Sequence, residues 1–423
     1  MNIMVVGGGG REHAIIKSLK KNPQIKEIFA LPGNGGIAED AICVPISATD
    51  IDGIVKFAKE KAMDFVVVAP DDPLAMGCVD RLHAEGIACF GPEAAAARIE
   101  SSKVFSKNLM KKYGIPTAAY QVFGDLSAAL EYLETAPIPT VIKADGLALG
   151  KGVSIAQTRE EAKTAATEMM AGGKFGKSGS TVVIEEFLTG PEVSVLAFTD
   201  GHVVRPMVSS MDHKRIGDGD VGLNTGGMGT IAPNPCYTEE AKKRCMEEIF
   251  LPTIRAMQAE GCPFKGCLYF GLMLTPDGPK VIEYNCRFGD PETQVVLPLL
   301  ETDLLTVMQA VEKETLSELD IRWSEKSAAC VILASGGYPE SYEKGKEITI
   351  PALAENVTCF HAGSKLADNK LVTSGGRVLG ITATADTLKE ALKDAYAAAQ
   401  SIHFDRKYMR HDIGHRALRA MEE

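Results

Sequence analysis

The chain has 423 residues, of which 45% are hydrophobic and 24% charged, and its formal net charge is −11. This length exceeds what one hydrophobic core usually organises, so we expect two to four domains. The negative charge argues against a broad nucleic-acid-binding surface, which needs clustered Lys and Arg. No stretch approaches the roughly 20 apolar residues of a membrane-spanning helix, and no basic segment with a cleavage site marks a leader.

Short apolar runs alternate with amphipathic stretches along the first hundred residues. This alternation is typical of a buried parallel sheet with helices between its strands. Gly91 and Pro92 then mark the end of this alternating region. We therefore predict an α/β domain with a doubly wound parallel sheet, with strands at 3–6, 28–31, 65–69 and 87–90 and helices at 12–20, 52–61 and 73–85.

The central region begins with a predicted helix at 102–113 and a smaller unit at about 118–187. Two antiparallel strands, 192–199 and 202–208, precede a polar, glycine-rich stretch from 209 to 235. Loops of this length are usually functional or disordered. The smaller unit contains predicted strands at 140–143, 152–156 and 182–186 and a helix at about 159–171.

A long helix at 238–259 and a hairpin turning at Pro276-Asp277-Gly278 complete the central region. Residues 323–329 have a composition that suits a boundary between two domains. The remaining chain mixes strands at 330–334 and 378–383 with a helix at 388–401, which predicts a small α+β domain. We therefore divide the chain into domains at 1–100, 101–322 and 323–423.

The first strand runs into four glycines, Gly7 to Gly10, before residues that can begin a helix. A dinucleotide site would need G-x-G-x-x-G, but the third position holds Glu12 or His13. The second strand is followed by "ALPGNGG", which lacks the acid that would bind a ribose. The glycines either hold some other phosphate at the helix N-terminus, together with the second turn around Asn34, or simply form tight turns.

Several central motifs combine nucleotide-binding residue types. "GLALGKGVS" is a glycine loop carrying Lys151, and it follows a strand that ends in Lys143. "VIEYNCRFGDPETQ" ends a strand with Glu283, Asn285 and Arg287 at alternate positions, so these three side chains share one face. Glutamate and asparagine oxygens suit Mg²⁺, and an arginine can grip a carboxylate or phosphate with two hydrogen bonds.

Together with "VIEEFLTGPEVS" at 183–194, these motifs resemble the ATP-grasp superfamily. The resemblance implies that Lys103 and Lys143 contact phosphates, and that Lys151 lies on a mobile loop that closes over them. It implies that Glu283 and Asn285 hold Mg²⁺, with Mn²⁺ as an alternative. The preceding strand, 269–273, lacks the second metal-binding acid of many members. The implied adenine and ribose contacts are Glu185, Glu186, Phe187, Leu188 and Glu192.

Motifs spread over nearly the whole chain are similar to the phosphoribosylamine–glycine ligase family of purine biosynthesis. They are "GGREHA", "PGNGG", "IKADGLALGKGV", "MDHKRIGDGD", "NTGGMG", "EYNCRFGDPETQ", "SGGYP" and "GGRVL". The resemblance implies a phosphoribosylamine-binding N-terminal domain, an ATP-grasp domain with a mobile sub-lobe at about 118–187, and a C-terminal domain. One departure is Asp71, where the family usually has glutamate.

The resemblance also implies a reaction. ATP, glycine and 5-phosphoribosylamine would give glycinamide ribonucleotide, ADP and phosphate through glycyl phosphate. Arg287 would bind the glycine carboxylate or the acyl phosphate, assisted by Lys151, and Asp212 would meet an amino group or simply belong to a solvated run of charges. The remaining predicted substrate contacts are Gly8, Gly9, Gly10, Asn34, Asn224, Thr225 and Gly226.

We expect a monofunctional cytoplasmic enzyme, monomeric or weakly homo-oligomeric, with no nucleic-acid or membrane partner. The ten cysteines contain no Cys-x-x-Cys pair and suit buried thiols in a reducing compartment. Three alternatives stay open at this point: a different ATP-grasp ligase, a nicotinamide dehydrogenase built on the N-terminal fold, and a non-catalytic nucleotide sensor.

Overall fold

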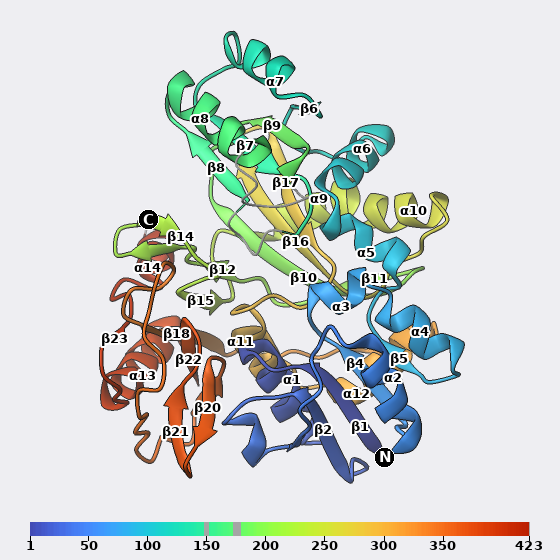
Figure 1. Cartoon of the computed structure of the whole chain (residues 1–423), viewed down its shortest axis with the longest axis vertical. Coiled ribbons are helices and arrows are strands. Elements are labelled where there is room, and N and C mark those ends of the chain that lie inside the picture. Colours follow the sequence, from blue (N-terminus) through green and yellow to red (C-terminus); the bar gives the residue numbers. More distant parts are fainter. Residues whose placement is uncertain (148–151, 172–178, 423) are drawn as a thin grey trace.

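The computed structural model describes residues 1–147, 152–171 and 179–422, so the predicted site residue Lys151 lies outside the described residues. Its strands form four larger sheets and two hairpins. In Figure 1 the parallel sheet of the N-terminus lies at the bottom, the sheet of the C-terminus at the lower left, and the sub-lobe at the top. The strands β16 (Lys265–Thr275) and β17 (Gly278–Asn285) run through the middle.

The N-terminal sheet is parallel, with strand order β3-β2-β1-β4-β5. Alternate residues of β1 face opposite cores. Ile3 and Val5 pack with α1 and α12, whereas Met4 and Val6 pack with α2, α3 and α4. Burial on both faces explains why these strands are continuously apolar. The elements are β1 (Asn2–Gly7), α1 (Gly10–Leu19), β2 (Glu27–Pro32), a 3₁₀ turn (Ile37–Glu39), β3 (Ile42–Cys43), α2 (Ile51–Glu60), β4 (Phe65–Val68), α3 (Asp71–Ala75), α4 (Cys78–Ala84), β5 (Cys89–Phe90) and α12 (Leu304–Glu312).

The predicted helix at 73–85 was wrong as a single element. It is split into α3 and α4 at Gly77, whose φ of +80° ends the first helix and which then caps the second. The prediction also missed two elements near the sheet: β3, and the helix α5 (Ala94–Ser101) that precedes α6 (Lys103–Tyr113).

The sub-lobe is an antiparallel sheet of order β6-β9-β7-β8, covered on one face by α7 and α8. On β7 the side chains of Ile142 and Ala144 pack against these helices. Lys143 points to the opposite face, because successive side chains of a strand alternate. The elements are β6 (Tyr120–Phe123), α7 (Leu126–Leu133), β7 (Thr140–Ala144), β8 (Val153–Ala156), α8 (Arg159–Met170) and β9 (Val182–Glu186).

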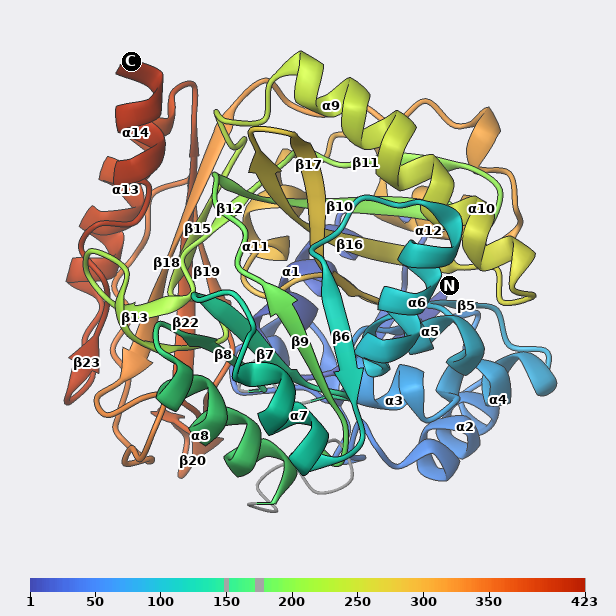
Figure 2. The same ribbon diagram turned by 90° about the horizontal axis from the view of Figure 1, so that it is seen from above.

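The central sheet has order β11-β10-β16-β17 and packs on one long helical segment. This segment consists of α9 (Glu239–Cys245), a π-helical turn (Met246–Phe250) and α10 (Leu251–Ala259), which agrees with the predicted helix at 238–259. Figure 2 shows it lying across the sheet. The other two strands are β10 (Glu192–Asp200) and β11 (Val204–Pro206).

A β-bulge in β17 orients the side chain of Glu283, a predicted metal ligand. The pairing with β16 matches Leu272 with Val281 and Gly271 with Glu283, so Ile282 is an extra residue. Val281 and Tyr284 therefore both reach the hydrophobic core, while Glu283 turns to the other face. Bulges commonly redirect side chains in this way beside active sites.

The C-terminal sheet takes two strands from the segment 209–235, which was predicted to be a loop. Its order is β12-β15-β18-β22-β19, with β23 paired to β18. The strands in this segment are too short and too glycine-rich for a periodicity signal. They are β12 (Met211–Asp212), β13 (Arg215–Gly217), β14 (Val221–Asn224) and β15 (Gly229–Ala232).

The predicted helix at 388–401 matches α13, which covers this sheet. All ten cysteines are free thiols, and no helix in the described ranges is long and apolar enough to cross a membrane. The remaining elements are α11 (Thr293–Val296), 3₁₀ turns (Leu297–Leu299 and Leu316–Glu318), β18 (Ser327–Ser335), β19 (Val357–His361), β20 (Ser364–Ala367), β21 (Lys370–Thr373), β22 (Arg377–Ala385), β23 (Lys407–Tyr408) and α14 (His415–Glu422).

Candidate active site

A cavity of about 590 Å³ lies between the sub-lobe sheet and the central sheet and extends towards the N- and C-terminal sheets. It collects most of the predicted site residues, although they come from distant parts of the sequence. Those that line it are Lys103, Lys143, Glu185, Glu186, Phe187, Leu188, Glu192, Asp212, Asn224, Thr225, Gly226, Glu283, Asn285 and Arg287.

Two lysines and one glutamate form a buried cluster at the sub-lobe end. The Glu185 carboxylate lies 3.0 Å from Lys107 Nζ and 3.1 Å from Lys143 Nζ, and all three side chains are at most 6% exposed. Burial lowers the pKa of Lys107 to about 8, and Glu185 opposes this shift. Glu185 Oε1 has no hydrogen-bond partner within the described residues. The side chain of Glu185 therefore fixes the two ammonium groups, in addition to lying at the predicted adenine position.

The two predicted phosphate-binding lysines are anchored by backbone carbonyls. Lys143 Nζ donates to the carbonyl of Ile282, the extra residue of the bulge (3.0 Å), and Lys103 Nζ donates to the carbonyl of Gly146 (2.7 Å). Burial lowers the pKa of Lys103, and the neighbouring Lys143 contributes to the shift. Both ammonium groups are thus held near Glu283, where phosphate charge can be neutralised.

Glu283 is ionised and paired. Its Oε1 accepts from Lys214 Nζ at 3.2 Å. The Lys214 charge holds the pKa of Glu283 at about 2, against the effect of burial. In return, Glu283 raises the pKa of Lys214 well above its ordinary value. This glutamate is therefore a carboxylate at any physiological pH, as a metal ligand must be.

Glu100, on α5, holds two further predicted site residues: Asn285 at the end of β17 and Arg287 in the loop that follows. Its Oε1 accepts from Asn285 Nδ2 (3.0 Å) and from an Arg287 terminal nitrogen (2.9 Å), and its Oε2 accepts from the Cys286 backbone N–H (2.7 Å). The amide nitrogen of Asn285 is thereby occupied, which leaves Asn285 Oδ1 available as a ligand. Such outer contacts orient metal ligands and tune their affinity.

Glu283 and Asn285 fit the needs of Mg²⁺. They stand at alternate positions on one face of β17 and supply two hard oxygen ligands, and Mg²⁺ usually completes its shell with phosphate oxygens and water. No cluster of three or more His, Cys, Asp or Glu side chains with metal-binding geometry occurs in the described parts of the chain. A site that relies on the nucleotide for its remaining ligands is consistent with this donor set.

The loop 224–227 is held by its own hydrogen bonds. Thr225 Oγ1 donates to the Lys214 carbonyl (2.8 Å), while the Gly226 N–H donates to the Tyr338 hydroxyl (3.0 Å). Arg377 donates to the Gly226 carbonyl (2.7 Å) and to the Asp290 carbonyl (2.8 Å). Thr225 and Gly226 therefore line the cavity while using these donors internally.

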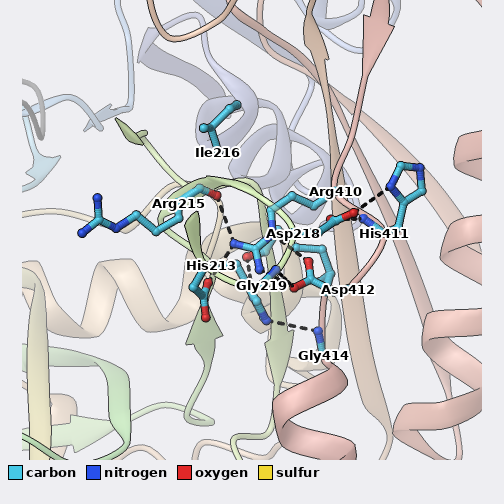
Figure 3. A network of polar contacts seen from close by, with 12 residues as sticks. His213, Arg215, Ile216, Asp218, Gly219, Arg410, His411, Asp412 and Gly414 are labelled. Atoms are coloured by element: carbon cyan, nitrogen blue, oxygen red, sulfur yellow. Dashed lines mark hydrogen bonds and ion pairs between the residues drawn. The ribbon is translucent and has the colours of Figure 1, made fainter. Parts of the chain in front are cut away.

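The hairpin β13–β14, which leads to Asn224, is fastened to the end of the chain (Figure 3). The Arg410 side chain is 1% exposed. It forms two 2.8 Å hydrogen bonds to Asp412 and one of 2.9 Å to Asp220, and it donates to the Arg215 carbonyl (3.0 Å). Asp412 also accepts from the Gly219 N–H (2.8 Å). One buried guanidinium thus connects β13 and the turn of the hairpin to the segment before α14.

The N-terminal glycines do not line the cavity. The Gly9 N–H donates to Glu12 Oε2 (2.6 Å), so the carboxylate of α1 caps its own helix. A side chain at Gly8 would collide with the Gly33 carbonyl, which explains the glycine there. Asn34 is fully used: its Nδ2 donates to the carbonyls of Gly8 (3.0 Å) and His361 (2.7 Å), and its Oδ1 accepts from two backbone N–H groups. Arg11, which follows the glycines, does reach the cavity.

Sequence reasoning missed several cavity residues. Lys107 and Glu100 lie on helices whose sequences carry no motif, so no signal marked them. Glu292, Tyr338 and Arg377 lie inside motifs that were recognised without being resolved into roles, and Lys214 was noted only as a neighbour of Asp212. The further charged residues at the cavity wall are Arg11, Asp71 and Asp290.

Two antiparallel four-stranded sheets that enclose lysines, a Glu/Asn pair and a nucleotide-sized cavity define an ATP-grasp enzyme. Comparisons with known proteins agree. Family models described as the phosphoribosylglycinamide synthetase N domain, ATP-grasp (A) domain and C domain match residues 1–100, 101–293 and 328–416. The chain belongs to the phosphoribosylglycinamide synthetase family.

Individual relatives support this membership. The phosphoribosylamine–glycine ligase of Vibrio vulnificus (strain YJ016) is 47% identical over 423 residues, which is 99% of both chains. The crystal structure of the Thermotoga maritima phosphoribosylamine–glycine ligase superposes with a TM-score of 0.86 at 36% identity, covering 98% of this chain and all of the other. A Campylobacter jejuni biotin carboxylase shares the fold alone, with a TM-score of 0.75, 14% identity, and coverage of 96% and 92%.

Proposed function

We propose that the cavity joins glycine to the amine of 5-phosphoribosylamine at the expense of ATP, giving glycinamide ribonucleotide, ADP and phosphate. One observation carries this proposal: a single cavity brings together ammonium groups, a carboxylate–amide pair, and the guanidinium groups of Arg11, Arg287 and Arg377. The relatives named phosphoribosylamine–glycine ligase, similar over their full length, give the reaction its substrates.

The chemistry begins with activation of a carboxylate. An oxygen of the glycine carboxylate attacks the γ-phosphorus of ATP, the bond from that phosphorus to the β,γ-bridging oxygen breaks, and ADP leaves. Lys103 and Lys143 neutralise charge on the transferring group, as fixed cations do in phosphoryl transfer. Glu283 and Asn285 would hold Mg²⁺, which when bound supplies Lewis-acid neutralisation of phosphate oxygens.

The amine then takes the acyl group. The nitrogen of phosphoribosylamine attacks the carbonyl carbon of glycyl phosphate, the carbon–oxygen bond to phosphate breaks, and the amine loses one proton. Every group involved is positioned without a covalent enzyme intermediate, so orientation and electrostatics account for the rate. Closure against water protects both the acyl phosphate and the amine.

Substrate positions follow from the charges. We propose that Arg287, with Lys151, serves the glycine carboxylate and the acyl phosphate, and that Glu185 to Leu188 and Glu192 flank the adenosine. Gly8 to Gly10 and Asn34 do not line the cavity, whereas Arg11, the residue after Gly10, does. We therefore assign the phosphate of phosphoribosylamine to this N-terminal side, with Asn224, Thr225 and Gly226 near its amine, and Asp212 to a substrate amino group.

The test is a coupled assay of ADP release with mass spectrometry of the product. We expect release that requires ATP, Mg²⁺, glycine and phosphoribosylamine together, and a product with the mass of glycinamide ribonucleotide. Release that depends on a different carboxylate or amine would refute the proposal. We further propose a cytoplasmic, monomeric or weakly homo-oligomeric enzyme, which the ten free thiols favour; sedimentation tests the assembly.

A further inference from the structure

We propose that Glu292, together with Asp212, binds the α-ammonium group of glycine and thereby sets the choice of an amino acid over other small carboxylates. This inference rests on the proposed function, because it names the group that recognises one of its substrates. Nothing in the sequence motifs or the comparisons gives Glu292 a role.

Glu292 is a buried carboxylate without a counter-ion. Its side chain is 4% exposed, lies at the wall of the cavity, and forms no ion pair with any described residue. The nearby cations are engaged elsewhere: Lys214 with Glu283 (3.2 Å), Arg287 with Glu100 (2.9 Å) and Arg377 with Asp290 (3.4 Å). A buried charge normally has a partner. A cationic ligand would supply one here.

Asp212 lines the same cavity as Glu292. Its Oδ1 accepts only the neighbouring His213 N–H (2.7 Å) within the described ranges. A Cβ on Gly227 would lie 2.7 Å from this oxygen and 2.5 Å from Pro291 Cδ, so the bare backbone at Gly227 allows the two acidic segments to meet. Burial raises the pKa of Asp212, and the charge of Glu292 raises it further. Burial likewise raises the pKa of Glu292, so a cation between the two groups would favour their ionised forms.

The neighbouring Arg287 supplies the second half of the recognition. Its Nε is buried and has no acceptor among the described residues, and like Glu292 it lines the cavity. An unpaired carboxylate close to a guanidinium with unused donor capacity is complementary to a zwitterion. In glycine, the ammonium and carboxylate groups are one carbon apart, as such a site requires.

The amine of phosphoribosylamine fits this corner less well. It must be unprotonated to attack the acyl carbon, whereas two carboxylates favour the protonated form of any amine between them. The same effect benefits glycine. A glycine held as ammonium cannot act as a nucleophile towards a second activated glycine, so the acidic pair also suppresses self-condensation.

The experiment compares wild type with Glu292→Gln, which keeps the shape and removes the charge. We expect the KM for glycine to rise about 10- to 100-fold, the range for loss of one charged hydrogen bond, with the KM for ATP within about twofold. Glycolate replaces the ammonium by a hydroxyl, so the preference for glycine over glycolate in kcat/KM should fall by a similar factor. Glu292→Asp should restore part of the preference.

Glu301→Gln is the matched control, since it removes an exposed carboxylate nine residues further along the chain. The melting temperature of Glu292→Gln should equal or exceed that of wild type, because the substitution relieves repulsion. An unchanged KM for glycine with an unchanged glycolate preference would overturn the inference, and so would a fall in kcat alone, which would assign Glu292 to the attacking amine. If wild type itself shows no glycine-dependent ADP release, the proposed function fails instead.

Discussion

Replacing Glu100 by Gln should weaken the metal site without touching a metal ligand. The Glu100 carboxylate accepts three hydrogen bonds from Cys286, Asn285 and Arg287. A glutamine has only one acceptor oxygen, and its NH₂ group would face a donor. The Asn285 amide then loses the contact that occupies its nitrogen, and Asn285 Oδ1 is no longer held as a ligand.

The magnitude follows from these contacts. A change in an outer partner of a metal ligand typically costs about 10- to 100-fold in metal affinity, or about 1.4 to 2.8 kcal/mol. The buried Arg287 also loses its counter-ion, and breaking a buried pair costs about 3 to 5 kcal/mol. Loss of metal affinity and loss of fold stability are thus predicted together.

The assay is a Mg²⁺ titration of ADP release at saturating ATP and glycine, with thermal unfolding measured in parallel. The apparent Mg²⁺ constant should rise by one to two orders of magnitude, while Glu301→Gln leaves it unchanged. A normal Mg²⁺ constant in a folded Glu100→Gln enzyme would show that Glu100 does not orient Asn285, and the explanation given for the metal ligand set would be wrong.

Three further changes test other contacts. The pKa of Glu283 is held at about 2, chiefly by Lys214, so the contribution of Glu283 to folding stability is complete above pH 4.5 and is lost as the pH falls towards 2. In Lys214→Met, the melting temperature should therefore fall less between pH 6 and pH 3 than it does in wild type. The pKa of His83 is raised to about 11 by Cys89, Glu312 and Glu93, so the contribution of His83 to folding stability is complete below pH 6.5 and declines as the pH rises towards 11. His83→Gln should therefore lower the free energy of unfolding in urea by about 1 kcal/mol at pH 6 and by less at pH 9. An equal cost at both pH values would contradict the assignment. Arg410→Met removes the ion pairs to Asp220 and Asp412 and should accelerate amide exchange in 211–232 but not in the sub-lobe, as followed by mass spectrometry. Uniform acceleration would indicate a global effect instead.

Much of the architecture was predictable because it depends on local signals. The fully apolar strands of the N-terminal sheet and the amphipathic helix at 388–401 carry strong periodicity, and the predicted fold class, family and ligase activity are confirmed. The alternate placement of Glu283 and Asn285 on β17 also followed from strand geometry. In contrast, the bulge at Ile282, which turns these side chains away from the core, depends on pairing with β16 and leaves no mark in the sequence of β17.

The rest of the site depends on long-range contacts. Glu185 could be assigned to the adenine contacts from its motif, but its pairing with Lys107 requires the packing of α6 against the sub-lobe. Glu100 lies on a helix that no capping or periodicity signal revealed. The short strand β15 exists because β18 offers it an edge about one hundred residues later in the chain, and β12 pairs in turn with β15. The positions of Gly8 to Gly10 and Asn34 as substrate contacts stay predictions.

The sharing of β12 and β15 with the C-terminal sheet has a consequence for how the protein is made on the ribosome. Domains generally fold in order as they emerge, and the lysines and glutamates of the nucleotide end are all synthesised by residue 285. However, Asp212 ends β12, which pairs with β15 and through it with β18, and the hairpin that follows Lys214 is fastened by Arg410. A nascent chain therefore acquires its nucleotide-binding groups long before its substrate-binding corner, so the competent ligase forms only once the last few dozen residues are in place.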